Sequence, residues 1–216
     1  MSHYFDESPA AASAATTVTV SVPGARFTMR TDRGVFSHGH LDRGTEVLLR
    51  HAPAPPPTGS LLDLGCGAGA IALTLATRSP AATVWAVDVN ARARALCASN
   101  AAANGLANVR VAAPDGVPAD VRIDALWSNP PIRIGKSALH ELLTTWLARL
   151  APDGRAALVV HKHLGSDSLQ RWLREHGWPA ERVASSAGFR VLTIARDEGP
   201  WPARSGAVRF PRRGRS

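Results

Sequence analysis

The pattern of hydrophobic and polar residues changes near residue 60. Valines alternate with Thr and Ser over residues 18–22, and Pro23-Gly24 follows, a pattern that predicts a β-hairpin continuing through 26–30. A short helix is expected at about 44–51, before a proline-rich break at 53–59. Beyond the break, short apolar runs alternate with stretches of helical period, which is typical of strands that alternate with helices.

This alternation predicts an α/β fold of the Rossmann-like class, with a mostly parallel seven-stranded sheet and helices on both faces. Strands are expected at Leu61–Leu64, Thr83–Asp88, Val109–Ala112, Ile123–Ser128, Arg155–Val160, Arg182–Ser185 and Phe189–Ala195. Helices are expected at Ala70–Arg78, Ala91–Asn104, Lys136–Leu150 and Ser168–His176, with a turn at Asp153-Gly154. The last two strands are joined only by Ala187-Gly188, so that edge of the sheet is expected to be antiparallel.

The chain length of 216 residues suits one α/β domain, which we expect to span 17–196. Within it, 17–59 would form the hairpin and short helix, and 60–196 the Rossmann-like core. The Ala/Ser-rich residues 1–16 are expected to be disordered, and the Arg/Gly/Pro-rich residues 197–216 to form a basic flexible tail.

The composition narrows the environment and the partners of the protein. The net charge of +8 favours an acidic partner such as RNA, although the arginine and alanine bias of a GC-rich genome would also produce it. Cys66 and Cys97 match neither a disulfide framework nor a zinc spacing, so we expect buried thiols in a reducing cytoplasm. No apolar run is long enough to cross a bilayer, and no membrane association is expected.

A glycine-rich segment at the end of the first core strand is the candidate cofactor site. It reads Asp63-Leu-Gly65-Cys-Gly67-Ala-Gly69, where glycines let the backbone turn sharply and approach a ligand. The spacing differs from the dinucleotide fingerprint, and Asp63 would repel a pyrophosphate but suits a cofactor that carries an ammonium and a sulfonium. Asp88 and Asp115 end the next two strands, positioned for a ribose and an adenine amino group; alternatively, each caps the helix that follows it.

The segment Asn129-Pro130-Pro131-Ile132 after the fourth core strand is the candidate reaction site. A planar amine is a poor nucleophile because its lone pair is delocalised. The Asn129 side-chain carbonyl and the Pro130 backbone carbonyl can accept its two N–H bonds and turn the lone pair toward a methyl donor, while the Pro-Pro step holds the loop extended. Catalysis would then consist mainly of positioning. The alternative is a rigid turn without a catalytic role.

With these motifs in place, the chain resembles the class I S-adenosylmethionine-dependent methyltransferases, and among them the ribosomal RNA small subunit (guanine-N2) methyltransferase C-like family. The matching stretches are Gly34–Ser37 with Leu41-Asp42, Asp63–Gly69, Asp88, Asn129–Lys136 and Gly188–Leu192. The resemblance implies S-adenosylmethionine as cofactor and ribosomal RNA as partner. It assigns the cofactor to Gly65, Gly67 and Asp88, to which the sequence adds Asp63, Gly69, Asp115 and Asn129.

The resemblance also implies that Asn129, Pro130 and Pro131 orient the target amine, and that the Phe36 loop closes over the substrate. Two departures matter. The duplicated N-terminal domain of the larger members has no counterpart in this sequence, and Ile132 stands where an aromatic residue usually stacks on the base. Phe36 or Arg133 is expected to take over that contact, with Lys136 beside the loop.

Other interpretations of the same residues remain open at this point. The acceptor can be another planar nitrogen, on a protein glutamine, an adenine N6 or a small metabolite, or the chain can be a non-catalytic RNA-binding module. The pairs His38/His40 and His161/His163 would allow a metal site, but no familiar ligand spacing completes one, and no metal is expected.

Overall fold

A computed structural model describes residues 16–31 and 40–196 of the chain. Its main sheet contains β3 (Thr58–Leu64), β4 (Ala81–Val87), β5 (Val109–Ala112), β6 (Ile123–Ser128), β7 (Leu150–His161), β8 (Ala180–Ser186) and β9 (Phe189–Ala195). The strand order is β5-β4-β3-β6-β7-β9-β8, and β5 through β7 are parallel. The predicted fold class is therefore confirmed.

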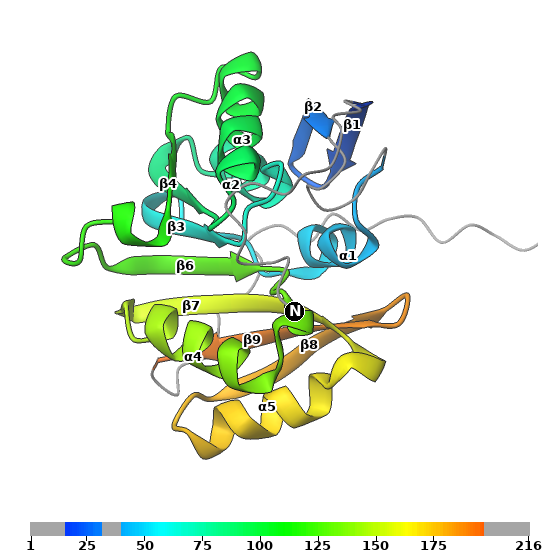
Figure 1. Cartoon of the computed structure of the whole chain (residues 1–216), viewed down its shortest axis with the longest axis vertical. Helices are drawn as coiled ribbons and strands as arrows, with labels where there is room; N and C mark the ends of the chain where they lie inside the picture. The colour runs from blue at the N-terminus through cyan, green and yellow to red at the C-terminus, as the bar shows by residue number, and fades with distance from the viewer. Residues whose placement is uncertain (1–15, 32–39, 197–216) are drawn as a thin grey trace, which may run out of the picture.

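Helices cover both faces of this sheet (Figure 1). They are α1 (Arg43–His51), α2 (Ala70–Arg78), α3 (Ala91–Ala103), α4 (Lys136–Leu147) and α5 (Ser166–Glu175). The first three cover one hydrophobic cluster, and α4 and α5 cover a second on the opposite face. Strands buried on both faces read as continuous apolar runs, which is why the core strands were visible in the sequence. No helix in the described ranges is long and apolar enough to span a membrane.

The antiparallel edge comes from β9, which lies between β7 and β8 and runs against both. Ala187 and Gly188 join the last two strands, and both have positive φ, 51° and 83°. Two successive positive φ values are the signature of a type I′ turn, whose twist matches that of a β-hairpin. The short connection therefore reverses the chain without a helix, as the sequence predicted.

The N-terminal hairpin forms a separate two-stranded sheet of β1 (Thr16–Val22) and β2 (Ala25–Thr31). Backbone groups on the free edge of β2 are hydrogen-bonded by side chains of α3 rather than by another strand. Asn104 and Asn100, one turn apart near the end of α3, hydrogen-bond the backbone of Thr28 and Arg30, respectively. These bonds fix the hairpin against α3. Thr16 lies in β1, not in the predicted disordered segment, while 1–15 and 197–216 are outside the described residues.

The junction of α4 and β7 differs from the prediction. The helix ends at Leu147 instead of Leu150, and Leu150 already pairs with Ile123 as the first residue of β7. The register then shifts, so that Arg155 lies opposite Ala125. A Cβ on Gly154 would lie 2.5 Å from the Ile123 carbonyl oxygen, so the chain passes too close to β6 for a side chain. The predicted turn at Asp153-Gly154 is therefore an irregularity inside one strand.

Candidate active site

The glycine loop follows β3 at the carboxyl edge of the sheet and is held by the neighbouring strand. The backbone N–H groups of Gly65 and Cys66 both donate to the Val87 carbonyl at the end of β4, at 2.8 and 3.0 Å. Ligands of open α/β folds bind at this edge, where the strands end and the chain turns into the next helix. The loop predicted from sequence therefore lies where a cofactor would be expected.

Gly69, the last glycine of the loop, cannot be replaced without strain. Its φ is +98°, and a Cβ there would lie 2.7 Å from the Cys97 sulfur and 2.9 Å from Leu73 Cδ1. Only glycine combines this backbone conformation with close packing of α2 against α3. Cys97 and Cys66 are both buried, as predicted, and the neighbouring Cys97 thiol, together with burial, raises the pKa of Cys66.

Asp63 is completely buried beneath the loop and is bound to α2. Its Oδ2 accepts the Ala72 N–H at 2.9 Å, which satisfies one of the free donors in the first turn of a helix whose N-cap is a glycine. Its Oδ1 has no partner among the described residues. Burial, with a smaller contribution from Asp88, raises the pKa of Asp63 to about 8. Without a cation beside it, this carboxyl is therefore mostly neutral at pH 7.

Asp88 lies at the end of β4 with only 8% of its surface exposed. One carboxylate oxygen accepts the Gly67 N–H and the other accepts the Asn90 N–H, each at 2.9 Å. Burial raises the pKa of Asp88, and these two backbone N–H groups and the charge of Arg94 oppose that shift. Each carboxylate oxygen keeps a lone pair for a ligand hydroxyl. The side chain thus shapes the loop and presents acceptors at the site.

Asp115 differs from Asp88 in almost every respect. It lies in a single 3₁₀ turn, Pro114–Gly116, directly after β5, and its side chain is exposed. The Asp88 N–H donates to the Ala112 carbonyl at 3.3 Å, so the ends of the two strands are adjacent. The structure therefore brings Asp115 to the correct edge of the sheet but does not fix its side chain.

Asn129 follows β6 at the same edge and is held by the start of α1. Its Nδ2 donates to Asp42 Oδ1 at 2.7 Å and to Thr45 Oγ1 at 3.1 Å. An ionised carboxylate can only accept hydrogen bonds, so the NH₂ end of the amide must face Asp42. The carbonyl end, Oδ1, accepts no hydrogen bond from the part of the chain that the structure describes. It is free to accept one from a ligand.

The two prolines after Asn129 turn the chain instead of extending it. Pro131 has φ −75° and ψ 76°, and the Pro130 carbonyl accepts the Ile132 N–H at 2.9 Å. This is an inverse γ-turn, which a proline at its centre favours because the ring fixes φ. The expectation of an extended Pro-Pro step was wrong. The Pro130 carbonyl keeps one lone pair for a second donor.

The predicted substrate-binding residues fall into three groups. Ile132 is half-buried and packs against the second hydrophobic cluster. Arg133 and Lys136 are exposed, one on the 3₁₀ turn Ile132–Ile134 and the other at the first residue of α4. Phe36 lies outside the described residues. The structure therefore places two cations beside the Asn129 loop and leaves the predicted stacking contact of Phe36 an expectation.

The histidine pairs show no metal geometry where the structure describes them. The Nδ1 of His161 accepts the His163 N–H at 3.3 Å, and the His161 ring packs edge-on against Phe189. Within 16–31 and 40–196, no three His, Cys, Asp or Glu side chains gather as metal ligands. His38 lies outside these ranges.

Three residues of the site were missed by sequence reasoning. Asp42 and Thr45 bind Asn129, and the buried Asn100 donates to the Ala68 carbonyl of the glycine loop at 2.8 Å while pairing with Arg30 in β2. Asp42 carried the signal of a helix N-cap, which predicts a bond to Thr45 N but not a bond to a residue far along the chain. A lone Asn inside a helix carries no signal of this kind.

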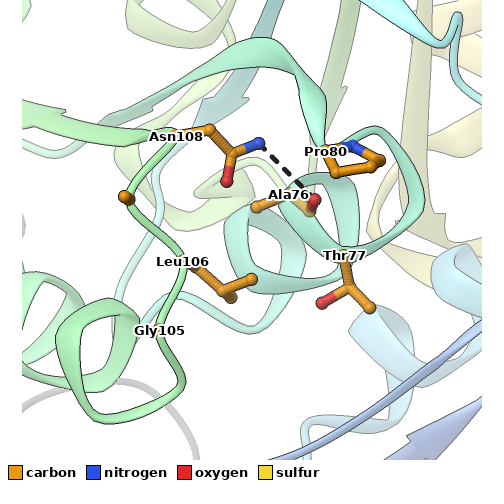
Figure 2. Close-up of a pocket in the computed structure, with 7 residues that line it drawn as sticks. Ala76, Thr77, Pro80, Gly105, Leu106 and Asn108 are labelled. Atoms are coloured by element: carbon orange, nitrogen blue, oxygen red, sulfur yellow. Dashed lines mark hydrogen bonds between the residues drawn. The ribbon is translucent and has the colours of Figure 1, made fainter.

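A separate pocket lies at the opposite edge of the sheet (Figure 2). Its volume is about 570 Å³, and its lining residues are Ala76, Thr77, Pro80 and 105–108. Ala76 and Thr77 lie near the end of α2, and the other residues lie in the loops that lead into β4 and β5, so the pocket is at the amino ends of these strands. Asn108 donates to three backbone carbonyls there, including that of Ala76. Among the described residues, none of those that line the pocket is charged, and none belongs to the carboxyl edge.

Comparison with known proteins identifies the family of the chain. The sequence model of the methyltransferase small domain matches residues 26–193. The chain is 34% identical to the uncharacterised protein YbxB of Bacillus subtilis over 193 residues, which cover 88% of this chain and 96% of that protein. It is 39% identical to the ribosomal RNA small subunit methyltransferase C of Pseudomonas paraeruginosa over 168 residues, 76% of this chain and 49% of that enzyme.

The solved structures agree on the fold. The 16S rRNA N2 G1207 methyltransferase of T. thermophilus, in complex with AdoMet and guanosine, superposes with a TM-score of 0.67 at 24% identity, over 88% of this chain and 52% of that chain. The chain thus spans about half the length of the ribosomal RNA methyltransferases that it matches. From the match over 26–193 and the identity to these relatives, the chain belongs to the methyltransferase small domain family of S-adenosylmethionine-dependent methyltransferases.

Proposed function

We propose that this methyltransferase acts on the exocyclic N2 of a guanine in ribosomal RNA. One observation carries the proposal: Asp42 and Thr45 occupy the NH₂ group of Asn129, so the group left to meet a ligand is its carbonyl oxygen and not an N–H donor. A carbonyl at that position selects an acceptor that can donate an N–H bond. An exocyclic base amine fulfils this requirement.

Several residues suit a cationic adenosine cofactor. Asp88 offers its remaining lone pairs to ribose hydroxyls, and Gly67 and Gly69 let the backbone approach the ligand. The unpartnered Oδ1 of Asp63 lies under the same loop, where a nearby cation would favour the ionised carboxylate. When bound, S-adenosylmethionine supplies a methyl group on a sulfonium, which is already a strong electrophile.

The acceptor amine needs two hydrogen-bond acceptors in fixed places. The Asn129 Oδ1 and the remaining lone pair of the Pro130 carbonyl supply them, and the γ-turn at Pro131 holds both groups on one short, stiff segment. Gripping both N–H bonds makes the nitrogen more tetrahedral and directs its lone pair toward the methyl group. The contribution of the protein is therefore mainly positioning.

The choice of RNA rests on charge and on relatives. The chain has a net charge of +8, and Arg133 and Lys136 are exposed beside the Asn129 loop, positioned for phosphate contacts. Relatives named ribosomal RNA methyltransferases support the partner, and the T. thermophilus structure with guanosine supports the base. A base inside a duplex cannot reach the edge of the sheet, so the guanine must be unpaired or flipped out.

The test is to incubate the purified protein with methyl-labelled cofactor and, separately, with ribosomal subunits, naked ribosomal RNA, tRNA, DNA and a protein extract. Digestion of the RNA and mass spectrometry should recover the label as 2-methylguanosine. Label recovered only in protein or in small molecules would refute the RNA substrate. Label recovered as N6-methyladenosine would keep RNA but refute guanine.

A further inference from the structure

One carboxylate oxygen of Asp42 accepts two hydrogen bonds, one from the start of α1 and one from Asn129. As the N-cap of α1, its Oδ1 accepts the Thr45 N–H at 2.8 Å, and its backbone carbonyl accepts the Glu46 N–H. The same Oδ1 accepts Nδ2 of Asn129 at 2.7 Å. The bonds from Thr45 and Glu46 are those that an N-cap makes, whereas the bond from Asn129 plays no part in capping and needs a separate explanation.

We propose that Asp42 is a positioning residue for methyl transfer: with Thr45, it holds the Asn129 amide in the one orientation that presents Oδ1 to the acceptor nitrogen. The inference rests on the proposed function only in requiring an acceptor that carries an N–H group. Asp42 acts through Asn129 and contacts neither the acceptor nor the methyl group.

The physical reason lies in the symmetry of an amide side chain. Its oxygen and its NH₂ group are nearly equal in size, so rotation by 180° about the last bond exchanges a donor for an acceptor with little steric cost. A rotated Asn129 would direct N–H groups at the N–H groups of the acceptor. A bond to an ionised carboxylate is roughly twice as strong as one between neutral groups, and here it favours one rotamer. Thr45, 94% buried, holds the second amide proton.

The start of α1 is packed firmly enough to serve as such a reference point. Gly44 lies between Asp42 and Thr45, and a Cβ there would lie 2.8 Å from the Phe189 ring. The ring of Phe189 in turn packs edge-on against His161 at the end of β7. Figure 1 shows α1 beside the carboxyl end of β6, where the Asn129 loop begins. Packing between α1, β7 and β9 thus fixes the position of Asp42, which is the anchor of the Asn129 side chain.

The chain offers substitutions that separate the two contacts of Asp42. Asp42→Ser keeps an N-cap oxygen, since serine caps helices well, but its shorter side chain cannot reach Asn129. Asp42→Asn keeps an acceptor oxygen for both bonds. We expect D42S to lower kcat at least tenfold, with the melting temperature within a few degrees of wild type and cofactor affinity within about threefold. D42N should recover most of the lost turnover.

A double-mutant cycle tests whether Asp42 acts through Asn129. In an Asn129→Ala background, adding D42S should lower kcat no further, because the group being positioned is gone. Additive losses would overturn the proposal, and so would wild-type turnover in D42S.

A second readout does not depend on any substrate. The side-chain NH₂ resonances of Asn129, assigned from their loss in Asn129→Ala, should exchange slowly with solvent in the wild type and in D42N, and fast in D42S. Unchanged exchange in D42S would overturn the proposed anchor, whatever the substrate. If instead no RNA accepts a methyl group but the exchange result holds, the proposed substrate fails while the role of Asp42 stands.

Discussion

The cofactor end and the acceptor end of the carboxyl edge are built from contacts of different range. At the cofactor end, Gly67 bonds Asp88, 21 residues away on the adjacent strand, and Asp63 bonds Ala72, nine residues away. At the acceptor end, Asn129 is held by Asp42 and Thr45, which are 87 and 84 residues earlier in the chain. The contacts of Asp63 and Asp88 lie within one β3-α2-β4 unit, to which Asn100 of α3 adds a bond to the loop, whereas the acceptor end depends on the docking of α1.

This difference separates the expected effects of substitutions at the two ends. Changes at the cofactor end should act on loop shape, buried charge and cofactor affinity, because those residues hold one another. Changes at the acceptor end should act on turnover, because Asn129 and its anchor only orient a side chain. The predictions below test this separation, beginning with the largest expected effect.

The buried carboxyl of Asp63 should make folding stability depend on pH. Its pKa is about 8 in the folded protein and near 3.8 when solvated, so the unfolded state ionises first as the pH rises. The free energy of unfolding should therefore fall between about pH 4 and pH 8, by at most ~1.4 kcal/mol per pH unit and on the order of 5 kcal/mol in total. Asp63→Asn, which keeps an oxygen for Ala72 N–H, should flatten this slope.

The measurement is chemical denaturation of both proteins between pH 4 and pH 8, without cofactor. Other groups titrate in the same range, but they do so in both proteins and cancel in the difference between them. Identical slopes for the wild type and D63N would mean that Asp63 is ionised in the folded state. Asp63 would then not be a buried neutral acid.

Asn129→Ala should separate turnover from cofactor binding. Removing one positioned polar group typically costs about 100-fold in kcat, or about 2.7 kcal/mol, whereas cofactor affinity should stay within a few-fold. Steady-state kinetics and calorimetry measure the two quantities. Asn108→Ala is a control for stability alone, since Asn108 bonds three carbonyls at the far edge of the sheet, of which Figure 2 shows the bond to Ala76. A loss of cofactor affinity as large as the loss of kcat would remove the distinction between the two ends.

The same difference in range explains what the sequence could predict. The strands Val109–Ala112, Ile123–Ser128 and Phe189–Ala195 have the bounds that their apolar runs indicated, and the glycine loop lies at the edge where it was expected. The hydrogen bond that Asn129 donates to Asp42 could not be predicted from the sequence, because it depends on how Gly44 packs against Phe189. The start of β7 was missed for a similar reason: Gly154 was interpreted as a turn, but it marks close approach to β6.

Asp88→Ala should weaken binding of S-adenosylmethionine by roughly tenfold to more than a hundredfold. Each hydrogen bond to a charged group contributes about 1.5–3 kcal/mol, and the variant also leaves the N–H groups of Gly67 and Asn90 without their acceptor. Calorimetry measures the affinity, and the melting temperature reports the loosened loop. Turnover at saturating cofactor should fall much less than in Asn129→Ala.

Asp115→Ala provides the matched comparison and the smallest expected effect. Asp115 lies in the turn after β5, the strand next to β4, and carries the same functional group as Asp88, but its side chain is exposed and accepts no hydrogen bond from the described residues. Because solvent screens the charge of an exposed carboxylate, its bond to an adenine amino group should be worth only about 0.5–1.5 kcal/mol, so affinity should fall by roughly two- to tenfold, with no change in melting temperature. A loss equal to that of Asp88→Ala would show that binding orders the turn after β5. Burial in the free protein would then be a poor guide to which acid holds the cofactor.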